Sequence, residues 1–278
     1  MKKVAKGKIG VFDSGLGGLT ILKAIVKLMP EREYIYLGDN LRAPYGGKSQ
    51  AEIFKYTLAG VEWLFNQGAE IVILACNTAS SNSLKRIQQE VLPIKYPKKK
   101  LLGIIIPTAE EVKGYSQSGH IGILATEATV LSGAFDLEIK KRGQAINVVC
   151  QTGGKLVELI EKNENESIVL SEIKRVIGEL IDRDGLIDVI LLGCTHYALI
   201  ADQIVGILPK NIKAIGQADL VAIKLSDYLE RHKDVRDRLS SLSAVQFYTT
   251  NDSDQVKNLM KKFYATDIPI SLASYSVA

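Results

Sequence analysis

Cysteine and histidine are scarce in this chain of 278 residues, which contains three of each. So few cysteines, in an odd number, do not describe a disulfide framework, and we expect free thiols in a reducing compartment. The chain also lacks any apolar run near the roughly 18 residues that span a bilayer. Its basic start, residues 1–8, leads into a predicted strand rather than the apolar core of a signal peptide. These absences predict a cytoplasmic protein that needs no membrane.

Charge of one sign is not in large excess either, because 35 basic residues face 31 acidic ones and the net charge is +4. This balance gives no indication that nucleic acid is a required partner. Hydrophobic residues make up 46% of the chain and charged residues 24%, which is ordinary for a globular protein. The length can bury a sizeable core and suits two α/β lobes or one large domain.

Two short apolar runs, residues 71–75 and 189–192, dominate the pattern. Such runs are typical of strands buried on both faces, and polar groups just past them lie at the carboxyl edge of a parallel sheet. Both runs lead into a cysteine followed by hydrogen-bonding side chains. These residues are Cys76, Asn77 and Thr78 after the first run, and Cys194, Thr195 and His196 after the second.

A second pair of strands precedes these runs at comparable intervals. Residues 9–12 lead into Asp13 and Ser14, and residues 121–125 lead into Thr126. The order of strand, polar residues, long interval, strand and cysteine therefore occurs twice. We interpret it as a duplication that gives two related lobes, whose thiols face each other across a cleft. Helical periodicity between the strands favours a mostly parallel α/β architecture.

The predicted lobes are not continuous in the sequence. Pro93 and Pro97 end the first unit, so the first lobe is expected to contain residues 1–97 together with 210–278, and the second lobe residues 98–209. The return after residue 209 is expected because the repeat of the second lobe is complete there. The predicted fold is two pseudo-symmetric α/β lobes, each a mostly parallel sheet flanked by helices, with the active site between them.

Three alternative sites make demands that the sequence does not meet. Zinc needs more ligands than Cys194 and His196, and no further cluster of such residues accompanies them. A cysteine hydrolase uses one nucleophile and leaves a second, mirrored cysteine unexplained. The glycine-rich segment 13–18 resembles part of a dinucleotide fingerprint, but Thr20 stands at the third glycine position. A loop that approaches a small anion at a helix N-terminus is the competing interpretation.

Two thiols on opposite walls suit the removal of a proton from one face of a carbon and the return of a proton to the other face. One cysteine must start as thiolate and the other as thiol. Because an ordinary thiol has a pKa of about 8.5, neighbours must adjust each site, and Asp13 and His196 are placed to do so. The groups predicted to hold an amino acid's carboxylate and ammonium are backbone N–H groups and the side chains of Ser14, Asn77, Thr78 and Thr195.

Five segments together resemble the aspartate/glutamate racemase family, in its glutamate-specific branch. They are residues 12–20, 36–39, 44–46, 75–80 and 192–197. The resemblance runs from residue 9 to about residue 230. It implies an isomerase that interconverts L- and D-glutamate with no cofactor and no metal. It also implies a homodimer that supplies D-glutamate for peptidoglycan, and hence for cell wall biogenesis and cell shape.

The same resemblance assigns roles to individual residues. Cys76 and Cys194 would be the two proton donors and acceptors, serving D-glutamate and L-glutamate respectively. Asp39 and Glu158 match acidic positions that assist the thiols. The positions matched as substrate contacts are Asp13, Ser14, Tyr45, Gly46, Asn77, Thr78, Thr126, Thr129, Thr195 and His196. The chain departs from the family pattern at Ala128, at residues 150–154, and at residues 215–218, where Ile-Gly-Gln-Ala replaces a strand-end aspartate–serine.

Two rival functions stay compatible with the sequence. The nearer is an aspartate racemase, or another amino-acid racemase of the same superfamily, with a different side-chain pocket. The farther is a protein that binds a small amino acid without catalysis, using the same strand ends. Retention of both cysteines favours catalysis, and a comparison of L-glutamate with L-aspartate would separate the two racemases.

Overall fold

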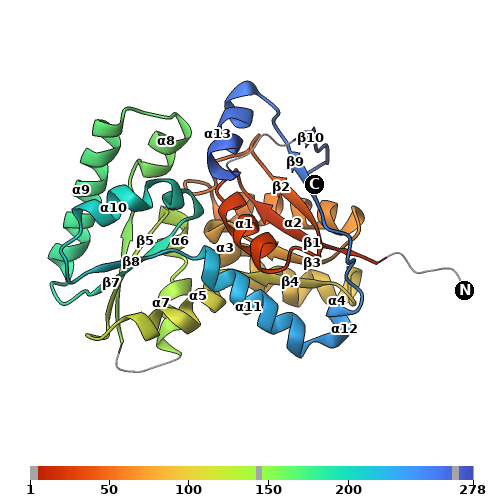
Figure 1. Cartoon of the computed structure of the whole chain (residues 1–278), viewed down its shortest axis with the longest axis horizontal. Helices are drawn as coiled ribbons and strands as arrows, with labels where there is room; N and C mark the ends of the chain where they lie inside the picture. Colours follow the sequence, from red (N-terminus) through yellow and green to blue (C-terminus); the bar gives the residue numbers. More distant parts are fainter. Residues whose placement is uncertain (1–5, 142–145, 265–268, 278) are drawn as a thin grey trace, which may run out of the picture.

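The structure is a computed structural model that describes residues 6–141, 146–264 and 269–277 (Figure 1). It contains two sheets, ordered β10-β9-β2-β1-β3-β4 and β6-β5-β7-β8, and every strand pair in them is parallel. The first sheet comprises β1 (Lys8–Asp13), β2 (Glu33–Gly38), β3 (Ala69–Leu74), β4 (Lys100–Gly103), β9 (Ala244–Thr249) and β10 (Ile270–Leu272). The second comprises β5 (His120–Ala125), β6 (Asn147–Thr152), β7 (Val189–Gly193) and β8 (Lys213–Ile215).

Helices cover both sheets, as Figure 1 shows with the first sheet on the right and the second on the left. Around the first sheet lie α1 (Leu19–Leu28), α2 (Gln50–Asn66), α3 (Asn77–Arg86), α4 (Leu92–Lys95), α11 (Ala218–Arg231), α12 (Lys233–Arg236) and α13 (Asp254–Tyr264). Around the second lie α5 (Ile105–Val112), α6 (Glu127–Leu131), α7 (Ala134–Lys140), α8 (Leu156–Glu161), α9 (Glu166–Arg183) and α10 (Ala201–Ile207). A π-helical segment, η1 (Ile87–Val91), and two 3₁₀-helical segments, η2 (Lys113–Tyr115) and η3 (Thr195–Ile200), complete the helical elements of the described residues. No helix of the described residues is both long and apolar enough to cross a membrane.

The two sheets repeat one topology, which confirms the predicted fold class. Four strands of the first sheet run in the order β4-β3-β1-β2, and the second sheet runs β8-β7-β5-β6. The cysteine-bearing strands β3 and β7 therefore occupy equivalent positions beside β1 and β5. The first sheet is extended by β9 and β10, which come from the C-terminal part of the chain.

The core follows the alternation of side chains along the strands. In β1, Ile9 and Val11 pack on the side of α1 and α11, whereas Phe12 packs with Val61 and Leu64 of α2 on the other side. The apolar cluster on the α1 side continues into the second lobe. Its members there include residues of β7, α9 and α10. Shared packing of this kind fixes how the two strand-end edges approach each other.

Both chain crossings between the sheets come later than predicted. Residues 100–103 were expected in the second lobe, but β4 pairs with β3 at the edge of the first sheet, which buries Leu101. Residues 213–215 were expected in the first lobe, but β8 pairs with β7 in the second sheet. Each strand completes the edge next to a cysteine strand. Pro93 lies in the first turn of α4, and Pro97 follows the end of that helix before β4. The crossings thus lead from β4 into α5 and from β8 into α11.

Candidate active site

The carboxyl ends of four central strands meet between the two lobes. Asp13 ends β1, Cys76 follows β3, Thr126 follows β5 and Cys194 follows β7. Hydrogen bonds join the two edges: Thr195 Oγ1 donates to Asp13 Oδ2 over 3.4 Å, and the hydroxyls of Thr78 and Thr126 lie 2.8 Å apart. The duplicated strand ends therefore meet at a single boundary between the lobes, which we call the cleft.

Close approach of the lobes requires glycine at two positions. A Cβ atom on Gly17 would lie 2.3 Å from Thr195 Oγ1 and 2.9 Å from the backbone nitrogen of His196. A Cβ on Gly46 would lie 3.0 Å from the Cβ of Thr126. The Gly46 carbonyl also accepts a hydrogen bond from the Ala128 N–H at 3.1 Å. Side chains at these positions would separate the walls, so the glycines are explained by contact between lobes rather than by a nucleotide fingerprint.

The first wall holds a protonated thiol. Cys76 is 6% exposed, caps the N-terminus of α3, and its Sγ lies 3.2 Å from Ser14 Oγ and 3.5 Å from the Ala79 nitrogen. Burial raises the pKa of Cys76 to about 12, and the nearby carboxylate of Asp13 adds to the rise. Both effects disfavour a second negative charge in a buried place. Cys76 is therefore neutral at physiological pH.

Asp13 lies fully buried between the two walls. Its Oδ1 accepts the Gly15 N–H at 2.8 Å, while Oδ2 faces Thr195 of the second lobe. Burial raises the pKa of Asp13, and the charge of His196 opposes that rise. Asp13 thus connects the charge state of the second wall to the environment of Cys76.

The second wall carries a cation. His196 Nδ1 lies 3.9 Å from Cys194 Sγ, and Nε2 lies 3.1 Å from Glu161 Oε1. Burial lowers the pKa of an imidazole, but Cys194 and Glu161 outweigh it and raise the pKa of His196 to about 10. The ring of Phe263 in α13 packs edge-on against the imidazole at 5.6 Å. An imidazolium held in this way is the neighbour that stabilises a thiolate.

The acid paired with His196 is Glu161, for which the sequence predicted no role, whereas Glu158 is the residue predicted to assist the thiols. Both residues lie in α8, but the Glu158 side chain is 56% exposed and forms an ion pair with Lys162 at 2.7 Å. The acidic–basic spacing of four residues between Glu158 and Lys162 is typical of a solvent-facing helix surface. That pattern in the sequence was the signal that Glu158 points away from the cleft.

Three threonine hydroxyls gather where the walls meet. Thr78 Oγ1 lies 2.8 Å from Thr126 Oγ1 and 3.4 Å from Thr129 Oγ1, and the latter two are 3.0 Å apart. Thr78 belongs to the first turn of α3, whose leading N–H groups have no acceptor within the helix. Hydroxyl and amide donors at a helix N-terminus form a site for a carboxylate. The structure thus brings together residues that the sequence placed in separate lobes.

Asp39 holds a loop in place through its hydrogen bonds. Its carboxylate accepts hydrogen bonds from Tyr45 at 2.6 Å, Arg42 at 2.7 Å and Thr250 at 2.8 Å. The Arg42 guanidinium lies against the ring of Tyr275 at 5.4 Å. Asp39 therefore holds the loop that carries Tyr45 and Gly46 against the second lobe. We interpret its predicted assisting role as indirect, through the position of this loop.

Asn77 does not present a free amide to the cleft. Its Nδ2 donates to Gln217 Oε1 at 2.7 Å, and Gln217 Nε2 donates back to Asn77 Oδ1 at 3.1 Å. In the sequence, Gln217 stands out only as a departure from the family pattern, which predicts no role for it. Across residues 6–141, 146–264 and 269–277, no three His, Cys, Asp or Glu side chains converge as a metal ion would require.

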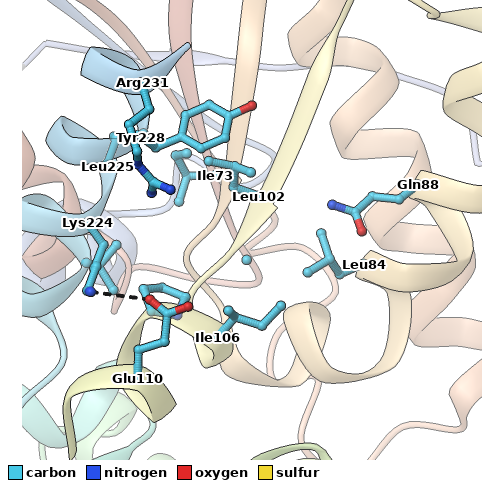
Figure 2. A pocket seen from close by; sticks show the side chains of 13 residues that line it. Ile73, Leu84, Gln88, Leu102, Ile106, Glu110, Lys224, Leu225, Tyr228 and Arg231 are labelled. Atoms are coloured by element: carbon cyan, nitrogen blue, oxygen red, sulfur yellow. Dashed lines mark ion pairs between the residues drawn. The ribbon is translucent and has the colours of Figure 1, made fainter. Parts of the chain in front are cut away.

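Two small cavities touch the second wall, and a third cavity, larger than these two, lies away from the candidate site. Two cavities of about 160 Å³ each touch it, one at His196 and Glu161 and the other at Cys194 and Thr195. Figure 2 shows a third, of about 190 Å³, between β4, α3, α5 and α11. Its lining is mainly apolar, and Lys224 and Glu110 form an ion pair at 3.3 Å on one side. None of the predicted site residues lines this third cavity.

The chain resembles known proteins along most of its length. Residues 9–215 match the family model described as Asp/Glu/Hydantoin racemase. The chain is 37% identical over 268 residues to a glutamate racemase of Paracoccus denitrificans, covering 92% of this chain and 96% of that one.

Solved structures share the fold of this chain. A glutamate racemase isoform of Bacillus anthracis superposes with a TM-score of 0.87 at 27% identity, covering 98% of both chains. A glutamate racemase of Francisella tularensis, solved with D-glutamate, gives a TM-score of 0.85 at 30% identity, again covering 98% of both chains. These proteins share the fold over 98% of the chain.

Proposed function

Since the chain belongs to the Asp/Glu/Hydantoin racemase family, we propose that it is a glutamate racemase that interconverts L- and D-glutamate with two thiols. The observation that carries the proposal is the pair of cysteines on opposite walls of one cleft, with different electrostatic neighbours. Cys76 is neutral beside Asp13, and Cys194 lies beside a charged His196. A reaction that needs one thiol and one thiolate is favoured by this difference between the neighbours of the two cysteines.

The substrate's carboxylates are attracted to donors that already line the cleft. These are the three threonine hydroxyls of residues 78, 126 and 129 and the N-terminus of α3. Asp13 is the anionic group suited to the substrate ammonium, because it is buried between the walls. With both ends held, the α-carbon lies between the thiols, and its hydrogen faces one of them.

Proton transfer then proceeds in two balanced steps. In the L-to-D direction, the Cys194 thiolate removes the α-proton, so that a C–H bond breaks and an S–H bond forms. The Cys76 thiol donates its proton to the opposite face of the carbanion and becomes the thiolate. The reverse direction exchanges the two roles. Ser14 Oγ, 3.2 Å from Cys76 Sγ, can donate a hydrogen bond to the thiolate that forms there.

His196 and Glu161 adjust the second thiol. While His196 is charged, it stabilises the thiolate of Cys194, and Glu161 stabilises the imidazolium in turn. The reaction requires no electron acceptor and no imine, so we propose that it needs neither an organic cofactor nor a metal. We also propose that the protein acts as a cytoplasmic homodimer and supplies D-glutamate for peptidoglycan.

The decisive test follows the circular dichroism of purified protein with L-glutamate and, separately, with L-aspartate. We expect loss of the L-glutamate signal until equal amounts of both enantiomers are present, in the presence of EDTA and without added cofactor. L-aspartate is expected to react far more slowly, because its shorter side chain leaves a buried carboxylate site unpaired. Comparable kcat/KM values would refute glutamate specificity and favour an aspartate racemase. No change with either amino acid would refute racemisation.

A further inference from the structure

A buried pair of amides joins the cleft to the hinge between the lobes. Asn77 and Gln217 exchange two hydrogen bonds, at 2.7 and 3.1 Å, and are 2% and 5% exposed. Gln217 Nε2 also donates to Thr108 Oγ1 at 3.0 Å, and that hydroxyl donates to the Ile104 carbonyl at 2.6 Å. Four residues from three separate segments are thus linked in one chain of hydrogen bonds.

The members of this chain come from both crossings between the lobes. Ile104 and Thr108 lie where β4 leads into α5, and Gln217 lies where β8 leads into α11. Any rotation of one lobe against the other must pass through these two crossings. Gln217 is the residue that touches both crossings and the catalytic edge.

Asn77, at the other end of the chain, begins α3. It directly follows Cys76, whose sulfur caps this helix, and precedes Thr78 of the hydroxyl cluster. Orientation of the first turn of α3 therefore determines where the Cys76 thiol and the leading helix N–H groups point. A buried amide that lost its partner would rotate toward other partners, since leaving it unpaired is costly.

We propose that Gln217 is a positioning residue, which fixes the Asn77 amide and thereby aligns the Cys76 end of α3 with the hinge. The expected change in kcat/KM rests on the proposed racemase activity. The expected change in the position of the Cys76 thiol does not. Gln217 touches no reacting atom. It acts by holding Asn77, and it should affect the first wall of the cleft more than the second.

The test compares Gln217→Met with Gln88→Met. Methionine keeps the length of the side chain and removes its amide in both variants. Gln88 is an exposed control for the same substitution, because its Nε2 donates to the Leu101 carbonyl at 2.8 Å beside the cavity in Figure 2, away from the thiols. We expect Gln217→Met to lower kcat/KM at least about tenfold, by the same factor in both directions, because the enantiomers are equally stable. Gln88→Met should stay within about twofold of the parent.

A second measurement needs no substrate. Iodoacetamide labelling followed by peptide mass spectrometry gives separate rates for Cys76 and Cys194, with the half-buried Cys150 as an internal reference. Gln217→Met should raise the Cys76 rate about fivefold relative to the Cys194 rate, because the first turn of α3 opens more often. A general loss of stability would raise both rates together, and that result would overturn the proposal.

A third variant tests the hydrogen-bond pattern itself. The protonated carboxyl of Gln217→Glu can both donate to and accept from the Asn77 amide, whereas the ionised carboxylate can only accept. The ratio of variant to parent kcat/KM should therefore fall as pH rises and the introduced carboxyl ionises. A ratio that does not vary with pH would contradict a role for the amide pair.

Outcomes for the proposed function and for Gln217 are separable. If the parent does not racemise glutamate, the proposed function fails, while the labelling comparison still tests the positioning role. If the parent is active and Gln217→Met matches Gln88→Met in kcat/KM and labelling, the inference is wrong. Should Gln217→Met not fold, Thr108→Val removes only the outer link. It should shift the Cys76 labelling rate in the same direction by a smaller factor, and an unchanged rate would overturn the proposal.

Discussion

The two walls of the cleft share a topology but not a chemistry. Cys76 follows β3, which pairs with β1, and Cys194 follows β7, which pairs with β5. The strand orders β4-β3-β1-β2 and β8-β7-β5-β6 are therefore equivalent. On the first wall the acidic neighbour of Cys76 is Asp13, and a hydroxyl completes the surroundings. On the second wall the neighbour of Cys194 is His196, supported by Glu161.

This difference shows how a duplicated scaffold can perform a reaction that is not symmetric at any instant. Racemisation in either direction needs a base on one face and an acid on the other. Two identical walls would give two thiols or two thiolates. Different neighbours make the surroundings of the two cysteines unequal, while the repeated strands keep both sulfurs at one cleft.

The largest expected effect comes from removing either thiol. Cys76→Ala and Cys194→Ala should each lower racemisation at least about 10³-fold, because every turnover uses both groups. Each variant should still exchange the α-hydrogen of one enantiomer with deuterated water. Cys76→Ala should exchange L-glutamate and Cys194→Ala should exchange D-glutamate, as measured by mass spectrometry.

Cys150→Ala is the matched control for this pair, because Cys150 is a free thiol on β6 outside the cleft. It should retain parental activity. Near-normal racemisation by either cleft variant would mean that one base suffices, and the duplication would then be architectural only. Exchange of the same enantiomer by both variants would show that the walls do not divide the two faces of the α-carbon.

A smaller effect should separate two glutamates of the same helix. Glu161→Gln removes the charge that stabilises the imidazolium, and we expect kcat to fall about 10²-fold. Glu158→Gln changes an exposed ion pair with Lys162 and should leave kcat within about twofold. Steady-state rates in both directions measure the difference. Equal losses for the two variants would contradict the assignment of Glu161 to the second wall.

Much of the architecture was predictable because it depends on local pattern. Apolar runs ending in Cys76 and Cys194 predicted buried parallel strands, and parallel strands must bring their carboxyl ends to one edge. The repeated order then predicted two lobes with one site. These features follow from side-chain periodicity and chain direction, which a sequence carries explicitly.

What escaped prediction depends on contacts between distant segments. Gln217 meets Asn77 across 140 positions of sequence, and Glu161 meets His196 across 35. Strand β4 joins the first sheet because its edge pairing with β3 buries Leu101, whereas the prolines nearby suggested an earlier boundary. Such choices are settled by packing between elements, for which a single sequence has no local signal.

The smallest expected effect is on the pH dependence of folding stability, which should differ between the two walls. The pKa of His196 is raised from its ordinary 6.5 to about 10 in the folded chain. Its charged form therefore contributes stability fully below pH 6.5, and the contribution is lost as pH rises through about 10. For Cys76 the pKa rises from 9.0 to about 12, so its contribution is complete below pH 9 and is lost between about 9 and 12.

Thermal unfolding of the parent, His196→Gln and Cys76→Ser, measured from pH 6 to pH 11, separates the two windows. His196→Gln should lose most relative to the parent at low pH, and its Tm should converge on that of the parent toward pH 10. Cys76→Ser should follow the parent's pH dependence up to about pH 9 and decline less steeply above it, because serine does not ionise there. Convergence of both variants in one window would mean that the walls titrate together, and the charge asymmetry between them would be lost.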